Sequence, residues 1–185
     1  MIELRDVTSG DRDMVRSWRN QPSVGRYMYS DHFISPGEHE GWFENAMADP
    51  ARKYWIIVCD DEDVGLANVY GINEDHRRCY WAFYIAKSDL RGKGVGSFVE
   101  FFILRYVFEE LGLNRLCCEV LANNPAVVEM HKRFGFHQEG IFRQHICKGE
   151  EWLDVVTLSM LASEWQSVKP GIEERLRGKG LLAPA

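Results

Sequence analysis

The chain has 185 residues, a hydrophobic content of 45% and a formal net charge of −6. This length suits one domain with a sizeable core, and the acidic balance excludes a broad basic face for nucleic acid. The five cysteines show no C-x-x-C or Cys/His metal spacing, so we expect reduced thiols, a cytoplasmic location and no metal.

The N-terminal sequence carries no sign of membrane targeting. Met1 leads directly into Ile2-Glu3-Leu4-Arg5 without a basic and then apolar leader, so we expect no signal peptide. The chain contains no apolar run long enough to span a bilayer.

Hydrophobic periodicity and turn residues predict strands and helices in alternation. In chain order we expect a strand at Ile2–Val7, a helix at Asp11–Asn20, a loop through Pro22 and Gly25, a helix opened by Ser35-Pro36-Gly37-Glu38, a meander of strands at Tyr54–Cys59, Val64–Tyr70 and Cys79–Ala86, a helix from Gly96 to about Leu111, a strand at Leu116–Leu121, a helix at Asn124–Phe134, a hairpin of Gly140–Cys147 and Glu151–Met160, and a short helix from Leu161. This order predicts an α/β sandwich in which helices cover a central mixed sheet. We expect a single domain over residues 1–168 and a loose tail over residues 169–185.

Two termini among these elements have explicit signals. Ser35 suits an N-cap, Pro36 the first helical position, and Glu38 completes a capping box. The helix after Gly96 is apolar on most faces, which predicts burial, and Gly112 suits its end.

A glycine-rich turn, Arg91-Gly92-Lys93-Gly94-Val95-Gly96, joins the third meander strand to the apolar helix. Glycine allows a close backbone approach, and successive N–H groups before a helix form an anion site. A Walker loop would need Ser or Thr where Gly94 stands, and a dinucleotide fingerprint would need Gly where Ser97 stands. We therefore interpret the turn as a different phosphate cradle; the alternative is a glycine-rich turn without a ligand. A second copy, Arg177-Gly178-Lys179-Gly180, is interpreted as tail.

The motif Arg91-x-x-Gly94-x-Gly96, the later Asn124-x6-His131-x3-Gly135-Phe136 and the element order together resemble the GNAT superfamily of N-acetyltransferases. The resemblance covers Ile2 to about Trp165. It implies a mostly antiparallel sheet that splays at a cofactor cleft, with acetyl-CoA as co-substrate. It also implies cofactor contacts from Ile85, Ala86, Arg91, Gly92, Lys93, Gly94, Val95, Gly96, Ser97 and Asn124. The alternative for Asn124 is a helix N-cap, and both roles are compatible.

Two residues are candidates for proton transfer. Many members of the family carry tyrosine at the position of His131, where it protonates the departing thiolate; histidine can also donate a proton, and a structural histidine is the alternative. Glu119 lies within an otherwise apolar strand, where a buried charge is costly. We interpret Glu119 as the general base, and a salt bridge to Arg115 or to a neighbouring strand is the alternative. Asp154 and Glu139 are weaker candidates.

We expect the first third of the chain to form the acceptor site, together with Trp81 from a later strand. The candidates are Arg19, Asn20, Met28, Tyr29, His39, Phe43 and Trp81. Arg19 and His39 are candidates for contacts to phosphates, while Met28, Tyr29, Phe43 and Trp81 are candidates for an apolar wall; the alternatives are exposed charge and plain core. The spaced pattern of Trp18-Arg19-Asn20, Met28, Ile34, His39 and Trp42-Phe43 resembles the subgroup that acetylates UDP-4-amino-4,6-dideoxy-N-acetyl-altrosamine in pseudaminic acid synthesis.

The resemblance leaves other functions open. The sequence suits a ribosomal-protein or peptide N-terminal acetyltransferase nearly as well, and a non-catalytic acyl-CoA-binding module is a further alternative. The expected partners are a small-molecule amine, with a nucleotide sugar favoured, and a second copy of the chain in a homodimer; nucleic acid and membranes are not expected.

Overall fold

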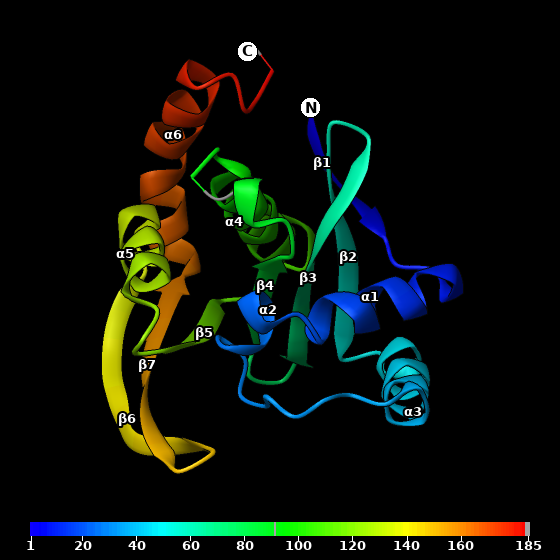
Figure 1. Cartoon of the computed structure of the whole chain (residues 1–185). Coiled ribbons are helices and arrows are strands. Elements are labelled where there is room, and N and C mark those ends of the chain that lie inside the picture. The colour runs from blue at the N-terminus through cyan, green and yellow to red at the C-terminus, as the bar shows by residue number, and fades with distance from the viewer. Residues whose placement is uncertain (91, 184–185) are drawn as a thin grey trace.

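A computed structural model describes residues 1–90 and 92–183 and shows one seven-stranded sheet with strand order β1-β2-β3-β4-β5-β7-β6 (Figure 1). The strands are β1 (Ile2–Asp6), β2 (Arg52–Cys59), β3 (Glu62–Asn73), β4 (Arg78–Ile85), β5 (Arg115–Leu121), β6 (His137–Lys148) and β7 (Glu151–Leu161). Every neighbouring pair is antiparallel except β4 and β5, which are parallel. The predicted fold class, a mostly antiparallel mixed sheet covered by helices, is confirmed.

The helical elements match the predicted order with local differences. They are η1 (Ser9–Asp11), α1 (Arg12–Arg19), α2 (Pro22–Gly25), α3 (Pro36–Ala48), η2 (Ser88–Leu90), α4 (Val95–Arg105), η3 (a π-helical turn, Tyr106–Glu110), α5 (Pro125–Phe134) and α6 (Ala162–Gly178). The expected loop through Pro22 and Gly25 contains the short helix α2, because Pro22 occupies its first position.

The cap of α3 is only half of the predicted box. The Ser35 hydroxyl accepts a hydrogen bond from the Glu38 N–H at 3.3 Å. The Glu38 carboxylate instead pairs with His32 at 2.7 Å. The pairing with His32 therefore replaces the predicted hydrogen bond from the Ser35 N–H to the Glu38 carboxylate.

The sheet is buried on both faces, which the alternation along β2 shows. Trp55 and Ile57 pack in one cluster with residues of α4, α5 and α6. Tyr54, Ile56 and Val58 pack in a second cluster with residues of α1, α2 and α3. Figure 1 shows these two groups of helices on opposite sides of the strands. The cores therefore fix the sheet between two helical layers. Within the part of the chain that the structure describes, no helix has the length and apolarity needed to cross a membrane.

The expected short helix is longer than predicted and includes residues 169–178 of the expected tail, which corrects the prediction for that stretch. Helix α6 runs from Ala162 to Gly178 despite Pro170 in its interior. Its first half is anchored to η3, because the Trp165 Nε1–H donates to Glu109 at 2.9 Å and the Lys169 ammonium pairs with the same carboxylate at 2.8 Å. These contacts could not be read from local sequence, since Glu109 lies far away along the chain.

The parallel pair β4–β5 is short, and the sheet opens beyond it. The two strands are paired only at Arg78–Arg115, Cys79–Leu116 and Tyr80–Cys117. Beyond Tyr80, β4 stays paired with β3, and β5 stays paired with β7 along its whole length. The two halves of the sheet therefore diverge and leave one edge of β4 without a strand partner.

Candidate active site

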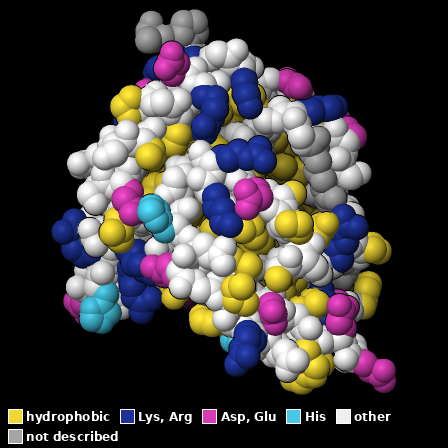
Figure 2. Space-filling model, turned by 90° about the vertical axis from the view of Figure 1, so that its left-hand side faces the viewer, with side chains coloured by type: hydrophobic (Ala, Val, Ile, Leu, Met, Phe, Trp, Pro, Cys, Tyr) yellow, Lys and Arg dark blue, Asp and Glu magenta, His cyan; other side chains and the backbone are white. Residues whose placement is uncertain are grey.

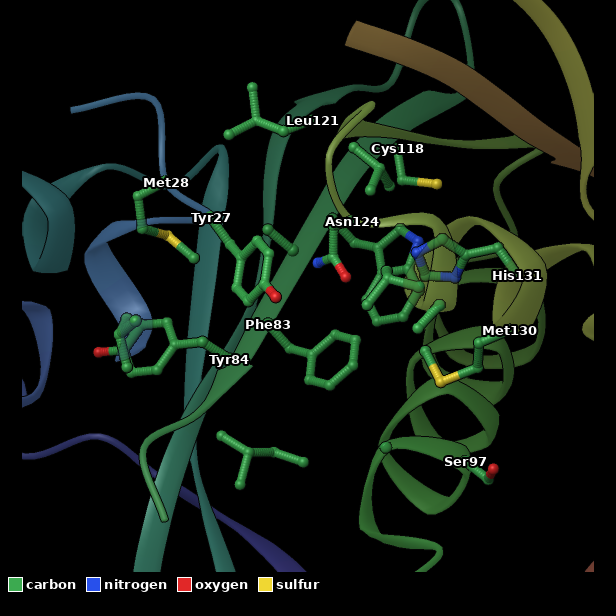
Figure 3. Close-up of a pocket in the computed structure, with 18 of the residues that line it drawn as sticks. Tyr27, Met28, Phe83, Tyr84, Ser97, Cys118, Leu121, Asn124, Met130 and His131 are labelled. Atoms are coloured by element: carbon green, nitrogen blue, oxygen red, sulfur yellow. The ribbon is translucent and has the colours of Figure 1, made fainter. Parts of the chain in front are cut away.

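A cavity of about 990 Å³ lies where β4 and β5 diverge. Its walls come from these two strands, the first turn of α4 with the preceding glycine turn, α5, and the segment Ser23–Tyr29 that follows α1. Figure 3 shows side chains from these elements pointing toward one another, including Phe83 from β4 and Met130 from α5. A volume of this size is typical of a site for a small molecule.

The glycine turn lies on this cavity. Gly92, Lys93, Gly94, Gly96 and Ser97 line it. Gly94 is the N-cap of α4 with φ of 91°, a left-handed conformation that favours glycine. The first N–H groups of α4 lack acceptors within the helix, so the turn has the donors that an anion needs.

The predicted cofactor contacts of this turn also include Val95 and Arg91. Val95 is fully buried in the main core and does not line the cavity, because its side chain is the first that α4 turns toward the sheet. Arg91 lies outside the described residues.

Ile85, the last residue of β4, and the next residue, Ala86, were both predicted to contact the cofactor, but their surroundings differ. Ile85 lines the cavity. The Ala86 N–H instead donates to the Val64 carbonyl at 2.8 Å, and its side chain is buried in the cluster under α1 and α2. The Ala86 N–H is therefore bonded to the neighbouring strand, and a cofactor contact at this residue stays a prediction for its carbonyl group.

Asn124 begins α5 and lines the cavity. Its side chain makes no capping hydrogen bond, although capping was the structural alternative for this residue. Figure 3 shows its amide group pointing into the cavity. The amide is therefore available to a ligand.

The Glu119 carboxylate lies on β5 and accepts a hydrogen bond from the Tyr29 hydroxyl at 2.6 Å. The alternative, a salt bridge from Glu119 to Arg115, is not formed, because Arg115 pairs with Glu139. Burial, and then the hydrogen bond to Glu119, raises the pKa of Tyr29, so its hydroxyl remains the donor. Glu119 also lines a second cavity of about 350 Å³.

His131 lies on the wall of the large cavity but is only 3% exposed. Its Nδ1 is 2.8 Å from the carboxylate of Glu100, which is completely buried on α4. Burial by itself would lower the pKa of His131, but the negative charge of Glu100 prevails and raises that pKa to about 10. This shift favours the protonated imidazole at neutral pH, while burial raises the pKa of the Glu100 carboxyl. The second oxygen of Glu100 has no partner among the described residues.

Three of the predicted acceptor residues meet at the cavity. Met28, Tyr29 and Trp81 line it, and Trp81 packs edge-on against the His131 ring at 5.2 Å. The Met28 side chain points toward the cavity in Figure 3. These residues form part of an apolar wall.

The other predicted acceptor residues have structural contacts and do not line the cavity. The Asn20 side chain holds the backbone of Ile34 through two hydrogen bonds of 2.8 and 3.0 Å. His39 is buried and bonds the Arg12 carbonyl at 2.9 Å, joining α3 to α1. Phe43 is buried beside it, and Arg19 bonds the Ser30 hydroxyl at 3.1 Å.

Residues 2–137 match the family described as Acetyltransferase (GNAT) domain. The chain belongs to the GNAT acetyltransferase family. It is 28% identical over 152 residues to Acetyltransferase PseH of Campylobacter jejuni subsp. jejuni serotype O:23/36 (strain 81-176), covering 80% of this chain and 93% of that protein. It is 22% identical over 183 residues to Spermidine N(1)-acetyltransferase of Escherichia coli (strain K12), covering 99% of this chain and 95% of that protein.

A solved structure shows the same fold. The spermidine N-acetyltransferase from Vibrio cholerae, crystallised with CoA and spermine, superposes with a TM-score of 0.82 at 23% identity, covering 89% of this chain and 98% of that chain. At this identity the likeness shows the fold alone. With the family, it makes the protein an acetyl-CoA-dependent N-acetyltransferase of GNAT type.

The cavity of this GNAT enzyme fits acetyl-CoA. It combines a glycine turn at a helix N-terminus, an unpaired edge of β4 and an apolar lining. Lys93, Arg133 and Lys179 add positive charge to its walls. Figure 2 shows Lys and Arg side chains gathered over the upper part of one face of the molecule. These features suit the phosphates and the uncharged arm of that co-substrate.

Several site residues of this GNAT enzyme escaped the sequence analysis. Glu100 stands in the middle of an apolar helix, and that isolated charge was the signal for a buried partner. Tyr27 reaches into the cavity from the segment after α2, opposite Asn124 (Figure 3). The Lys148 ammonium binds the carbonyls of Gly25, Arg26 and Met28 at 2.8, 3.2 and 2.9 Å. No local sequence pattern indicates that Tyr27 or Lys148 belongs to the site, because their roles depend on contacts between distant segments.

Proposed function

We propose that this enzyme transfers the acetyl group of acetyl-CoA to the 4-amino group of a UDP-linked amino-deoxy sugar. The resemblance of the sequence to the pseudaminic acid subgroup motivates the proposal, and the similarity to Acetyltransferase PseH supports it. We place the reaction in the cytoplasm, in keeping with cysteines that are all free.

The charge of the cavity is the observation that carries the choice of acceptor. Among the described residues, Glu119 is the only carboxylate that lines the large cavity, whereas Arg26 adds a positive charge besides Lys93, Arg133 and Lys179, which are assigned to the co-substrate. A polyamine would need several carboxylates near its ammonium groups. An acceptor that carries a diphosphate instead gains from cations. Arg26 belongs to the same segment as Met28 and Tyr29, so we assign it to the acceptor.

The apolar wall suits the deoxygenated carbon of such a sugar. Met28 and Trp81 present hydrocarbon and ring surface to the cavity. Burial of one methyl group contributes about 0.8 kcal/mol. This amount gives a preference of several fold for the deoxy sugar over the corresponding hydroxymethyl sugar.

Glu119 is proposed as the general base. The neutral amine adds to the acetyl carbonyl of the acetyl-CoA thioester and the bond to sulfur breaks. An amine arrives mostly as ammonium, so a proton must first be removed, and the Glu119 carboxylate accepts it through water. The Tyr29 hydroxyl holds one carboxylate oxygen at 2.6 Å, which leaves the other oxygen for this task. The second proton that the nitrogen loses passes through water to the departing thiolate, so the products are the amide and the CoA thiol.

His131 is proposed to stabilise the departing sulfur. A pKa of about 10 makes its imidazolium a weaker acid than a thiol, whose pKa is about 8.5. Complete proton transfer to sulfur would therefore be uphill by about 2 kcal/mol. We assign His131 the role of a fixed positive charge beside the thiolate, balanced by Glu100.

A comparison of acceptors tests the proposal. The enzyme with acetyl-CoA would be incubated separately with a UDP-4-amino-4,6-dideoxy sugar, with spermidine and with a peptide carrying a free N-terminus, while released CoA thiol is measured. We expect turnover with the amino sugar at a kcat/KM at least a hundredfold above the other two. Turnover of the peptide or of spermidine without the sugar would refute the proposed acceptor, and binding of acetyl-CoA with no turnover of any amine would favour a non-catalytic module.

A further inference from the structure

Helix α6 lies along α4 and brings the end of the described chain to the glycine turn. Near its start, Trp165 packs against Phe101 and Phe108, with ring centroids 5.9 and 6.3 Å apart. Its 17 residues span about 26 Å, close to the combined length of α4 and η3. Since α6 begins beside η3, its last turn reaches the N-terminus of α4, as Figure 1 shows.

The helix ends in a defined turn. The N–H groups of Gly180 and Leu181 donate to the carbonyls of Arg177 and Leu176, both at 2.9 Å, and Gly180 has φ of 69°. This arrangement is a Schellman-type ending, which reverses the chain direction. The repeated Arg-Gly-Lys-Gly letters at 177–180 are therefore a helix stop, with a glycine where the left-handed conformation requires one.

This ending places Leu181 on the glycine turn. A Cβ atom added to Gly94 would lie 2.7 Å from the Cδ1 atom of Leu181, so the two segments are in direct contact. Leu181 is also packed against the main core. The side chain of Leu181 thus covers the turn that opens α4.

The same ending places Lys179 on the rim of the large cavity, together with Lys93 of the glycine turn and Arg133 of α5. The C-terminus of a helix carries partial negative charge, which opposes a nearby phosphate. A lysine immediately after α6 offsets this effect. We propose that residues Lys179–Leu181 form part of the acetyl-CoA site: Leu181 positions the glycine turn, and the Lys179 ammonium binds a phosphate group of the co-substrate.

The inference rests on the use of acetyl-CoA and is independent of the amine acceptor. It can be tested by calorimetric titration of the full-length protein with CoA. Lys179→Ala should raise the Kd for CoA about tenfold, the effect typical of losing one hydrogen bond to a charged group. Lys179→Arg should retain most of the affinity. Arg177→Ala is the matched control, because Arg177 pairs with Glu173 at 3.2 Å and does not line the cavity.

A second ligand identifies the phosphate. If Lys179 binds the 3′-phosphate, the difference between Lys179→Ala and wild type disappears with 3′-dephospho-CoA; if it binds the pyrophosphate, the difference persists. Leu181→Ala should weaken CoA about threefold with either ligand. A Kd for Lys179→Ala equal to that of Arg177→Ala, or below that of wild type, would overturn the inference. This result would be distinct from failure of the proposed acceptor, because no amine enters the titration.

Discussion

Replacement of Glu100 by Gln would test the buried pair behind the cavity. In the wild type, Glu100 holds a proton on His131 by raising the pKa of its imidazole to about 10. Since one pH unit corresponds to about 1.36 kcal/mol, holding this proton at pH 7 stabilises the fold by at most about 4 kcal/mol. In Glu100→Gln the burial of His131 remains but the negative charge does not, so His131 becomes neutral.

The sign of the pH dependence follows from this shift. A histidine whose pKa is raised on folding contributes its full stabilisation below its ordinary value of 6.5 and loses it as the pH rises toward 10. The free energy of unfolding of Glu100→Gln should therefore fall below that of wild type by up to about 4 kcal/mol at pH 7, and the difference should shrink toward zero near pH 10. Urea denaturation of both proteins at several pH values measures this difference in the free energy of unfolding.

A matched control separates this effect from a general loss of packing. Glu109 pairs with Lys169, and although burial opposes it, that ammonium lowers the pKa of the Glu109 carboxyl. Its contribution therefore changes only in the acidic range, and the difference between Glu109→Gln and wild type should stay constant from pH 7 to pH 9. A Glu100→Gln difference that is equally constant over this range would refute the protonated state assigned to His131.

Four further variants test the turn, the base with its hydrogen-bond donor, and the segment that bears Tyr29. Gly94→Ala should destabilise the fold by about 1 kcal/mol more than Gly92→Ala in urea denaturation, because both glycines have positive φ but only Gly94 has a neighbour within 4 Å of an added Cβ. Glu119→Ala should lower kcat at least a hundredfold while the KM for acetyl-CoA changes little, and Tyr29→Phe should lower kcat about tenfold; unchanged turnover would remove either residue from the mechanism. Lys148→Met should raise the KM for the amine acceptor and leave the Kd for CoA unchanged, since it releases three carbonyls of that segment.

Most of the fold could be predicted from the sequence, because strands buried on both faces and amphipathic helices leave a direct record in apolar spacing. The strand β2 illustrates this, since its alternate residues enter two different cores. The prediction was wrong at α6, which continues to Gly178 through residues that were expected to be tail. Contacts to Glu109 and the α4 surface hold that helix, and such contacts have no local signature.

The site was predictable where it depends on backbone conformation. The glycine turn and Asn124 lie on the cavity as the motifs indicated. The prediction was less accurate for side chains of the first third of the chain, where His39 is buried and bonded to α1 and Phe43 is buried beside it. An aromatic residue on a helix face has the same spacing whether it meets a ligand or a core, so sequence alone could not separate these roles.

In the proposed mechanism, the contacts of residues 25–29 link acceptor binding to catalysis. The Lys148 ammonium fixes the backbone carbonyl of Met28, and the next residue, Tyr29, donates to the Glu119 carboxylate. A change in this segment that admits a different amine would also move the hydrogen-bond donor of the proposed base. A substitution that enlarges the cavity at Met28 should therefore alter kcat as well as the acceptor KM. If the segment were independent of the base, the same substitution would change the acceptor KM alone. Steady-state kinetics of Met28→Ala with the amino sugar distinguishes the two cases.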